Sequence, residues 1–140
     1  LYPAQNLDGD IFSDISAALG GSLATASSVI SSKDGTKLFE APHGTAHDLY
    51  VRYLETEGKE ANFNSSALIF AVASALEELA TREGNAALND YAARLKTALI
   101  ETVAQGTITG ELKGKTTSPE TERIVNMHGF LDAIADNLTT

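Results

Sequence analysis

Apolar residues recur with helical spacing through the second half of this 140-residue chain, and this pattern constrains the fold most. Residues 65–80 (SSALIFAVASALEELA) are apolar on almost every side, which is typical of a helix in a core or at a subunit interface. A second stripe runs through residues 86–105, and Gly106 is a natural C-terminal stop. We expect a last helix to start at Ser118-Pro119, because proline is favoured at the first helical position. The apolar stripe of this last helix comprises Ile124, Met127, Leu131, Ile134 and Leu138.

The first half of the chain predicts shorter elements. Phe12, Ile15 and Leu19 recur every three to four residues, so we expect a helix from near Asp10 to the pair Gly20-Gly21. The segments SSVISS and KLFEAP flank an Asp-Gly turn, which indicates two neighbouring strands and favours a hairpin. Short strands followed by three long helices predict the α/β class, with a mixed sheet and flanking helices.

Composition excludes several classes of function. A net charge of −9 and a pI near 4.6 argue against binding to nucleic acid or to an anionic membrane. The chain has no cysteine, so it contains neither a disulfide nor a thiolate metal site. No apolar run has membrane-spanning length. The first residues, LYPAQN, contain no initiator methionine and no helix start, and we expect the chain to begin inside a longer protein.

Three carboxylates occur within seven residues of the segment NLDGDIFSD, and no lysine or arginine precedes Lys33. In a helix that starts near Asp10, the side chains of Asp10 and Asp14 share one face, where they repel each other. Two converging carboxylates form part of a site for a hard divalent cation such as Mg²⁺ or Mn²⁺. The spacing leaves two readings open, a metal site and a solvated surface.

A calcium-binding EF-hand does not fit this segment. With Asn6 as the first ligand, Ile11 occupies the position that requires glycine, and Ala17 occupies that of the bidentate glutamate. Asp8 precedes Gly9 and is better explained as a turn former than as a ligand.

Two of the three histidines lie in the segment EAPHGTAHDLY, residues 40–50. Because the two rings are separated by Gly-Thr and no HExxH pattern is present, a zinc site is not indicated. The absence of a Gly-x-Ser-x-Gly elbow argues against a hydrolase triad. A glycine-containing loop with free backbone N–H groups suits a nucleotide, although both common phosphate-binding signatures are missing.

Together, and in this order, these motifs resemble the C-terminal half of the large domain of isocitrate dehydrogenases, in the β-decarboxylating dehydrogenase family. NLDGDIFSD is similar to the family's metal-site motif, GGSLATASSV to its Gly-Ser-Leu segment, and EAPHGTAHDLY to its adenosine-binding loop. Asn64 falls at the position of a cofactor-contacting asparagine. The segment ALIETVAQGTITGELKG resembles the family's Thr-x-Asp-Leu ending, with Glu111 in place of the aspartate.

The resemblance implies an isocitrate/isopropylmalate dehydrogenase-like α/β fold, with residues 1–64 as the metal and cofactor segment and residues 65–140 as the helical segment. It further implies that Asp10 and Asp14 bind Mg²⁺ or Mn²⁺, with a third aspartate from the partner subunit of a homodimer. The cofactor-binding residues that it implies are His43, Gly44, Thr45, Ala46, His47, Asp48, Leu49 and Asn64.

The implied reaction is the oxidative decarboxylation of isocitrate to 2-oxoglutarate, a step of the tricarboxylic acid cycle, in the cytoplasm or the mitochondrial matrix. NADP-dependent relatives carry basic residues after the His-Gly-Thr motif, where this chain has His47, Asp48 and Leu49. A carboxylate repels a 2′-phosphate but accepts hydrogen bonds from a free ribose hydroxyl. We therefore expect NAD rather than NADP, although a protonated His47 would partly offset Asp48.

The family's catalytic groups all precede the matching segment, so we expect no catalytic residue in this chain and no activity from the 140-residue chain alone. Three alternatives remain for the substrate, namely isopropylmalate, homoisocitrate and tartrate, since the residues that select it are absent. A non-catalytic subunit of the same fold is a further alternative, which the joint presence of Asp10, Asp14 and His43 disfavours.

Overall fold

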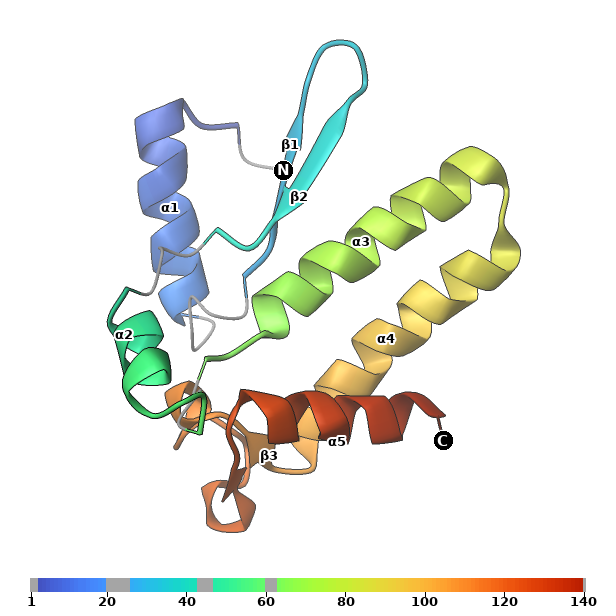
Figure 1. The fold of residues 1–140 in the computed structure, drawn as a ribbon. Helices are drawn as coiled ribbons and strands as arrows, with labels where there is room; N and C mark the ends of the chain where they lie inside the picture. The colour runs from blue at the N-terminus through green and yellow to red at the C-terminus, as the bar shows by residue number, and fades with distance from the viewer. Residues whose placement is uncertain (1–2, 20–25, 43–46, 60–62, 140) are drawn as a thin grey trace.

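The computed structural model describes residues 3–19, 26–42, 47–59 and 63–139. Two long helices, α3 (Ser66–Glu83) and α4 (Ala86–Ala104), form an antiparallel pair, and α5 (Met127–Thr139) packs across one end of it (Figure 1). The remaining elements are α1 (Asn6–Leu19), β1 (Ser28–Ser31), β2 (Lys37–Glu40), α2 (His47–Glu55), β3 (Thr107–Ile108), β4 (Arg123–Ile124) and two short 3-10 helices, η2 (Gly110–Leu112) and η3 (Pro119–Thr121).

The connection between α3 and α4 is short because both helix ends have suitable capping residues. Gly84 adopts a left-handed conformation with φ of 63°, and its neighbour Asn85 donates its backbone N–H to the Ala80 carbonyl over 2.9 Å. The Asn85 side chain then accepts a hydrogen bond from the backbone N–H of Leu88 at 3.0 Å, which caps α4. The two predicted helices are thus confirmed, and α3 ends three residues later than expected.

The hydrophobic core lies where α5 crosses α3 and α4. Phe130 and Ile134 of α5 are buried against Ala98 and Leu99 of α4. Partly buried apolar side chains of all three helices surround this cluster, including Ile69, Phe70, Leu95, Val103 and Leu138. Ile134 belongs to the stripe predicted for the last helix, whereas Phe130, which is fully buried, lies outside that stripe.

The predicted hairpin is present. Strands β1 and β2 are antiparallel, with Val29 opposite Phe39 and Ile30 opposite Leu38. In the turn, Asp34 accepts hydrogen bonds from the Ser32 hydroxyl and from the backbone N–H of Thr36. The bond from Ser32, followed by that from Thr36, lowers the pKa of Asp34 from 3.8 to about 2.

Charged side chains connect this hairpin to α3. Lys37 Nζ of β2 donates to Glu78 Oε2 at 2.6 Å, and Arg82 Nε donates to Glu78 Oε1 at 2.9 Å. Arg82 Nη2 also donates to the carbonyl of Gly35 in the turn at 2.8 Å. The hydrogen bond from Lys37, followed by that from Arg82, lowers the pKa of Glu78 below 4.5.

We expect Glu78→Gln to lower the urea midpoint at pH 7 and to have a smaller effect at pH 3, where part of the contribution is lost. Because the folded-state pKa is depressed, the contribution of Glu78 is complete above the unfolded-state pKa and is lost as the pH falls through the folded-state value. Urea unfolding at both pH values, with Glu83→Gln on the same helix as a control, measures the effect. An equal shift at both pH values would contradict an ionic contribution.

The last helix begins later than predicted. Only the 3-10 turn η3 forms at Pro119, and α5 starts at Met127, so Ile124 belongs to β4 and not to the helical stripe. The reason is a parallel pairing, in which Arg123 donates its N–H to the Gly106 carbonyl at 2.7 Å and Val125 donates to that of Ile108 at 2.8 Å. A helix through residues 123–125 would give up these bonds.

Gly106 permits this pairing. It follows α4 with φ of +85°, and a Cβ at this position would lie 2.8 Å from the carbonyl oxygen of Thr121. The prediction that Gly106 ends the second helix is confirmed, and its missing side chain also allows the segment 119–124 to approach.

Helix α1 starts at Asn6 and not near Asp10, so Asp8 lies in its first turn and is helical. Its ordinary role there is to interact favourably with the positive helix end. The helical spacing of Phe12, Ile15 and Leu19 suggests a stripe that faces a core. The structure instead leaves these side chains exposed, and that of Leu19 is 84% exposed. Burial of this stripe would need a surface beyond the described residues.

The α/β class is confirmed, and the described residues show how small the strand content is. They form two separate two-stranded sheets, one antiparallel (β1–β2) and one parallel (β3–β4). In the described part of the chain, every helix is too short or too polar to cross a bilayer.

Candidate functional site

Asp10 and Asp14 lie on consecutive turns of α1, and both side chains are exposed. A spacing of four residues places them on the same face of the helix, as the sequence predicts. Among the described residues there is no group of three or more His, Cys, Asp or Glu side chains that could hold a metal. The chain therefore contributes a pair of carboxylates here.

The predicted adenosine loop falls partly outside the described residues. His43, Gly44, Thr45 and Ala46 lie outside them, whereas His47, Asp48 and Leu49 form the first turn of α2. His47 and Asp48 are exposed, and an acidic side chain in a first turn is favourable for any helix. The position of Asp48 is thus compatible with cofactor contact and is also explained by helix stability alone.

Asn64 lies two residues before the first residue of α3 and is 1% exposed. Its Oδ1 accepts a hydrogen bond from the backbone N–H of Ser66 at 2.8 Å, which satisfies one free donor at the helix start. This bond fixes the orientation of the side-chain amide. The amide nitrogen, Nδ2, is buried and has no hydrogen-bond partner among the described residues.

The backbone of Asn64 is held by a residue distant in sequence. Its N–H donates to Glu111 Oε2 at 2.9 Å, across a sequence separation of 47. Glu111 belongs to η2, whose next residue, Leu112, is buried. The start of α3 and the segment after β3 are therefore joined at this point.

Unpaired buried polar atoms concentrate around this junction. In the part of the chain that the structure describes, the buried side-chain atoms without a partner are Asn64 Nδ2, Ser65 Oγ, Ser66 Oγ and Thr109 Oγ1. Buried polar groups in folded proteins are nearly always paired, with protein, water or ligand. Three of the four belong to consecutive residues, and the fourth precedes Glu111 by two positions.

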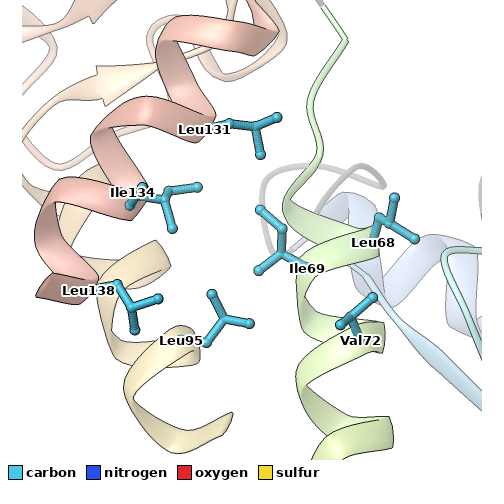
Figure 2. A pocket seen from close by; sticks show the side chains of 8 residues that line it. Leu68, Ile69, Val72, Leu95, Leu131, Ile134 and Leu138 are labelled. Carbon is cyan, nitrogen blue, oxygen red and sulfur yellow. The ribbon is translucent and has the colours of Figure 1, made fainter. Parts of the chain in front are cut away.

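An apolar groove of about 290 Å³ lies between α3, α4 and α5 (Figure 2). Leu131, Ile134 and Leu138 of α5 face Ile69 and Leu95 across it. Sites for substrates and cofactors combine apolar walls with a few placed polar groups, which this groove lacks. We therefore place the candidate site at Asn64 and α1 and not in the groove.

Sequence reasoning identified Asn64 but missed its partners. The structure brings Asn64 together with Glu111, and it places Ser65 and Ser66 in the same buried turn. The only signal for Glu111 in the sequence was its place in the Thr-x-Asp-Leu-like ending.

The match to a protein family covers nearly the whole chain. Residues 2–128 match the family described as isocitrate/isopropylmalate dehydrogenase. The chain therefore belongs to the isocitrate/isopropylmalate dehydrogenase family.

Curated relatives cover the same region. The chain is 36% identical, over its whole length, to "Isocitrate dehydrogenase [NADP], chloroplastic/mitochondrial" of Arabidopsis thaliana, and it covers 29% of that protein. It is 37% identical to "Isocitrate dehydrogenase [NADP] 1" of Mycobacterium tuberculosis (strain ATCC 25618 / H37Rv), with 99% of the chain and 33% of that protein covered. For "Isocitrate dehydrogenase [NADP], mitochondrial" of Sus scrofa, the identity is 34% and the shares are 99% and 34%. The chain thus spans about a third of the length of these relatives.

Proposed function

We propose that this chain supplies the cofactor contact and part of the metal site of an isocitrate dehydrogenase-type decarboxylating dehydrogenase. Family membership and the names of the relatives support the reaction class. The structural observation that carries the proposal is the buried, oriented and unpaired amide nitrogen of Asn64. A dinucleotide offers acceptors for such a donor in its adenine ring and its ribose oxygens.

The carboxylates of α1 fit a divalent metal ion in chemistry and number. Mg²⁺ takes one or two protein carboxylates and completes its octahedron with water or substrate oxygens. Asp10 and Asp14 offer two such groups on one helix face, with no lysine or arginine from residue 1 to residue 32. A metal bound there supplies Lewis-acid stabilisation to an oxygen-bearing substrate. The third carboxylate would come from the partner subunit of a homodimer.

The choice between NAD and NADP depends on the first turn of α2. We propose NAD, because the exposed carboxylate of Asp48 disfavours a 2′-phosphate and can accept a ribose hydroxyl. The three relatives described above are named for NADP. Their names speak against NAD and make NADP the second candidate. We predict that the protein is located in the cytoplasm or in the mitochondrial matrix.

Isocitrate-dependent reduction of NAD⁺ and NADP⁺ by the full-length protein tests the proposed reaction. We expect activity with Mg²⁺ or Mn²⁺ and a higher kcat/KM for NAD⁺. Asp48→Arg is expected to lower the KM for NADP⁺ about tenfold, the equivalent of about 1.4 kcal/mol, since a cation replaces an anion near the phosphate.

Glu55→Arg, at the other end of α2, makes the same charge change and is the matched control. A wild-type preference for NADP⁺ would make the NAD assignment wrong and leave the reaction standing. If isopropylmalate, homoisocitrate or tartrate replaced isocitrate as the turned-over substrate, the reaction class would stand and the substrate would change. A full-length protein that turns over none of these would be a non-catalytic subunit.

A further inference from the structure

The backbone at the cofactor contact has a separate anchor. Asn64 precedes the first residue of α3, so its N–H lies outside the hydrogen-bond ladder of the helix. Among the residues that the structure describes, this N–H donates to Glu111 Oε2, at 2.9 Å. A hydrogen bond to an ionised carboxylate is stronger than one between neutral groups. The position of Asn64 along the chain therefore depends on Glu111.

Glu111 projects from a well-supported segment. Ile108 and Thr109, which precede it, are fully buried, and Leu112, which follows it, is 6% exposed. The Leu112 N–H donates to the Thr109 carbonyl at 3.0 Å, which closes the 3-10 turn that carries Glu111. These buried residues restrict the backbone of the turn, so the carboxylate of Glu111, itself an exposed residue, extends toward Asn64 from a fixed backbone position.

The Asn64 side chain is held from the opposite direction. Its Oδ1 is bound to the Ser66 N–H at 2.8 Å, so the backbone and the side-chain oxygen of one residue both have a fixed partner. The group without a partner is Nδ2, with its two N–H donors. Two fixed points and one free donor are the arrangement expected for a preorganised ligand contact.

We propose that Glu111 is the positioning residue of the cofactor site, which holds the Asn64 backbone so that its buried amide presents its donors to the adenosine part of the dinucleotide. This inference rests on the proposed function. Glu111 acts through Asn64 and makes no contact of its own with the cofactor. A purely structural Glu111 would instead stabilise the whole fold, and its loss would lower the apparent kcat through the amount of folded protein while leaving the cofactor KM unchanged.

The test uses Glu111→Ala, Glu111→Gln and Asn64→Ala in the full-length protein. Glu111→Ala removes the acceptor, whereas Glu111→Gln keeps a side-chain oxygen of the same reach without the charge. We expect Glu111→Ala to raise the cofactor KM and Kd about tenfold, with kcat and the isocitrate KM within about twofold. Glu111→Gln should restore most of the cofactor affinity. Glu120→Gln, in the other 3-10 helix, is the charge-matched control.

The double variant Glu111→Ala/Asn64→Ala separates positioning from an independent effect. If Glu111 acts only through Asn64, the double variant binds the cofactor no more weakly than Asn64→Ala alone. Additive losses would overturn the proposal, as would a Glu111→Ala variant with wild-type cofactor affinity or one whose only change is a lower melting temperature. In each of these cases Asn64→Ala still weakens cofactor binding. If Asn64→Ala leaves the cofactor affinity unchanged, the proposed cofactor contact itself fails, and this inference fails with it.

Discussion

Asp10→Asn in the full-length protein is expected to reduce metal-dependent turnover by at least about 100-fold, because loss of even an outer-shell partner costs a metal site 10–100-fold. Asparagine preserves the size of the side chain but removes the negative charge that a hard cation needs. In this variant the carboxylate of Asp14, four residues further along α1, remains, and we expect it to bind a divalent ion weakly by itself. Titration of Mn²⁺ should show the same loss as the steady-state rate, and Asp14→Asn should behave alike.

Asp8→Asn is the matched control for this experiment. Asp8 lies in the first turn of the same helix and is exposed, so the substitution changes the net charge by the same amount. We expect Mn²⁺ affinity within about twofold of wild type and a loss in stability of less than about 1 kcal/mol. Equal loss of Mn²⁺ binding in the Asp8 and Asp10 variants would show a general charge effect and rule out a site at Asp10 and Asp14.

Phe130→Ala is expected to give the largest loss of stability in this chain, about 3–5 kcal/mol. The phenylalanine is 0% exposed and fills the space where α5 crosses α4, beside Leu99 and Ala98. Truncation removes the whole buried ring, and helices fixed by their own backbone bonds close the resulting cavity only in part. Urea unfolding followed by circular dichroism measures the loss, which is a large fraction of the stability of a typical domain.

Ile100→Ala provides the comparison, since this residue of α4 is 57% exposed. It removes a large apolar side chain from the same region without opening a core cavity, so the expected loss is below about 1 kcal/mol. Similar losses for the two variants would mean that α5 does not form the core described above.

Elements with strong local signals could be predicted from the sequence. Helices α3 and α4 have apolar periodicity together with Gly84, Asn85 and Gly106 at their ends, and the β1–β2 hairpin has an Asp-Gly turn. The start of α5 was predicted wrongly, because Pro119 is a good first helical residue in isolation. The parallel pairing of β4 with β3 decides that segment, and this pairing joins residues far apart in the chain.

Part of the candidate site was also predictable. The shared helix face of Asp10 and Asp14 follows from their spacing once a helix is expected there, even though α1 begins earlier than predicted. The burial of Asn64 and its bond to Glu111 were not predictable, because no local rule relates residues 47 positions apart. The exposure of Phe12 on α1 was likewise not predictable, because periodicity indicates an apolar face but does not indicate what covers that face.

The amino-acid sequence by itself determined α3, α4, the hairpin turn, the acidic pair on α1 and, through its motifs, the likeness to the β-decarboxylating dehydrogenases. Capping, periodicity and charge spacing act over one or two helical turns, so they can be recognised in a single amino-acid sequence. The tertiary structure alone decided which apolar stripe is buried, where the last helix begins, and that a carboxylate after β3 holds the backbone of Asn64. These features depend on the packing of α3, α4 and α5, which brings distant segments into hydrogen-bonding range.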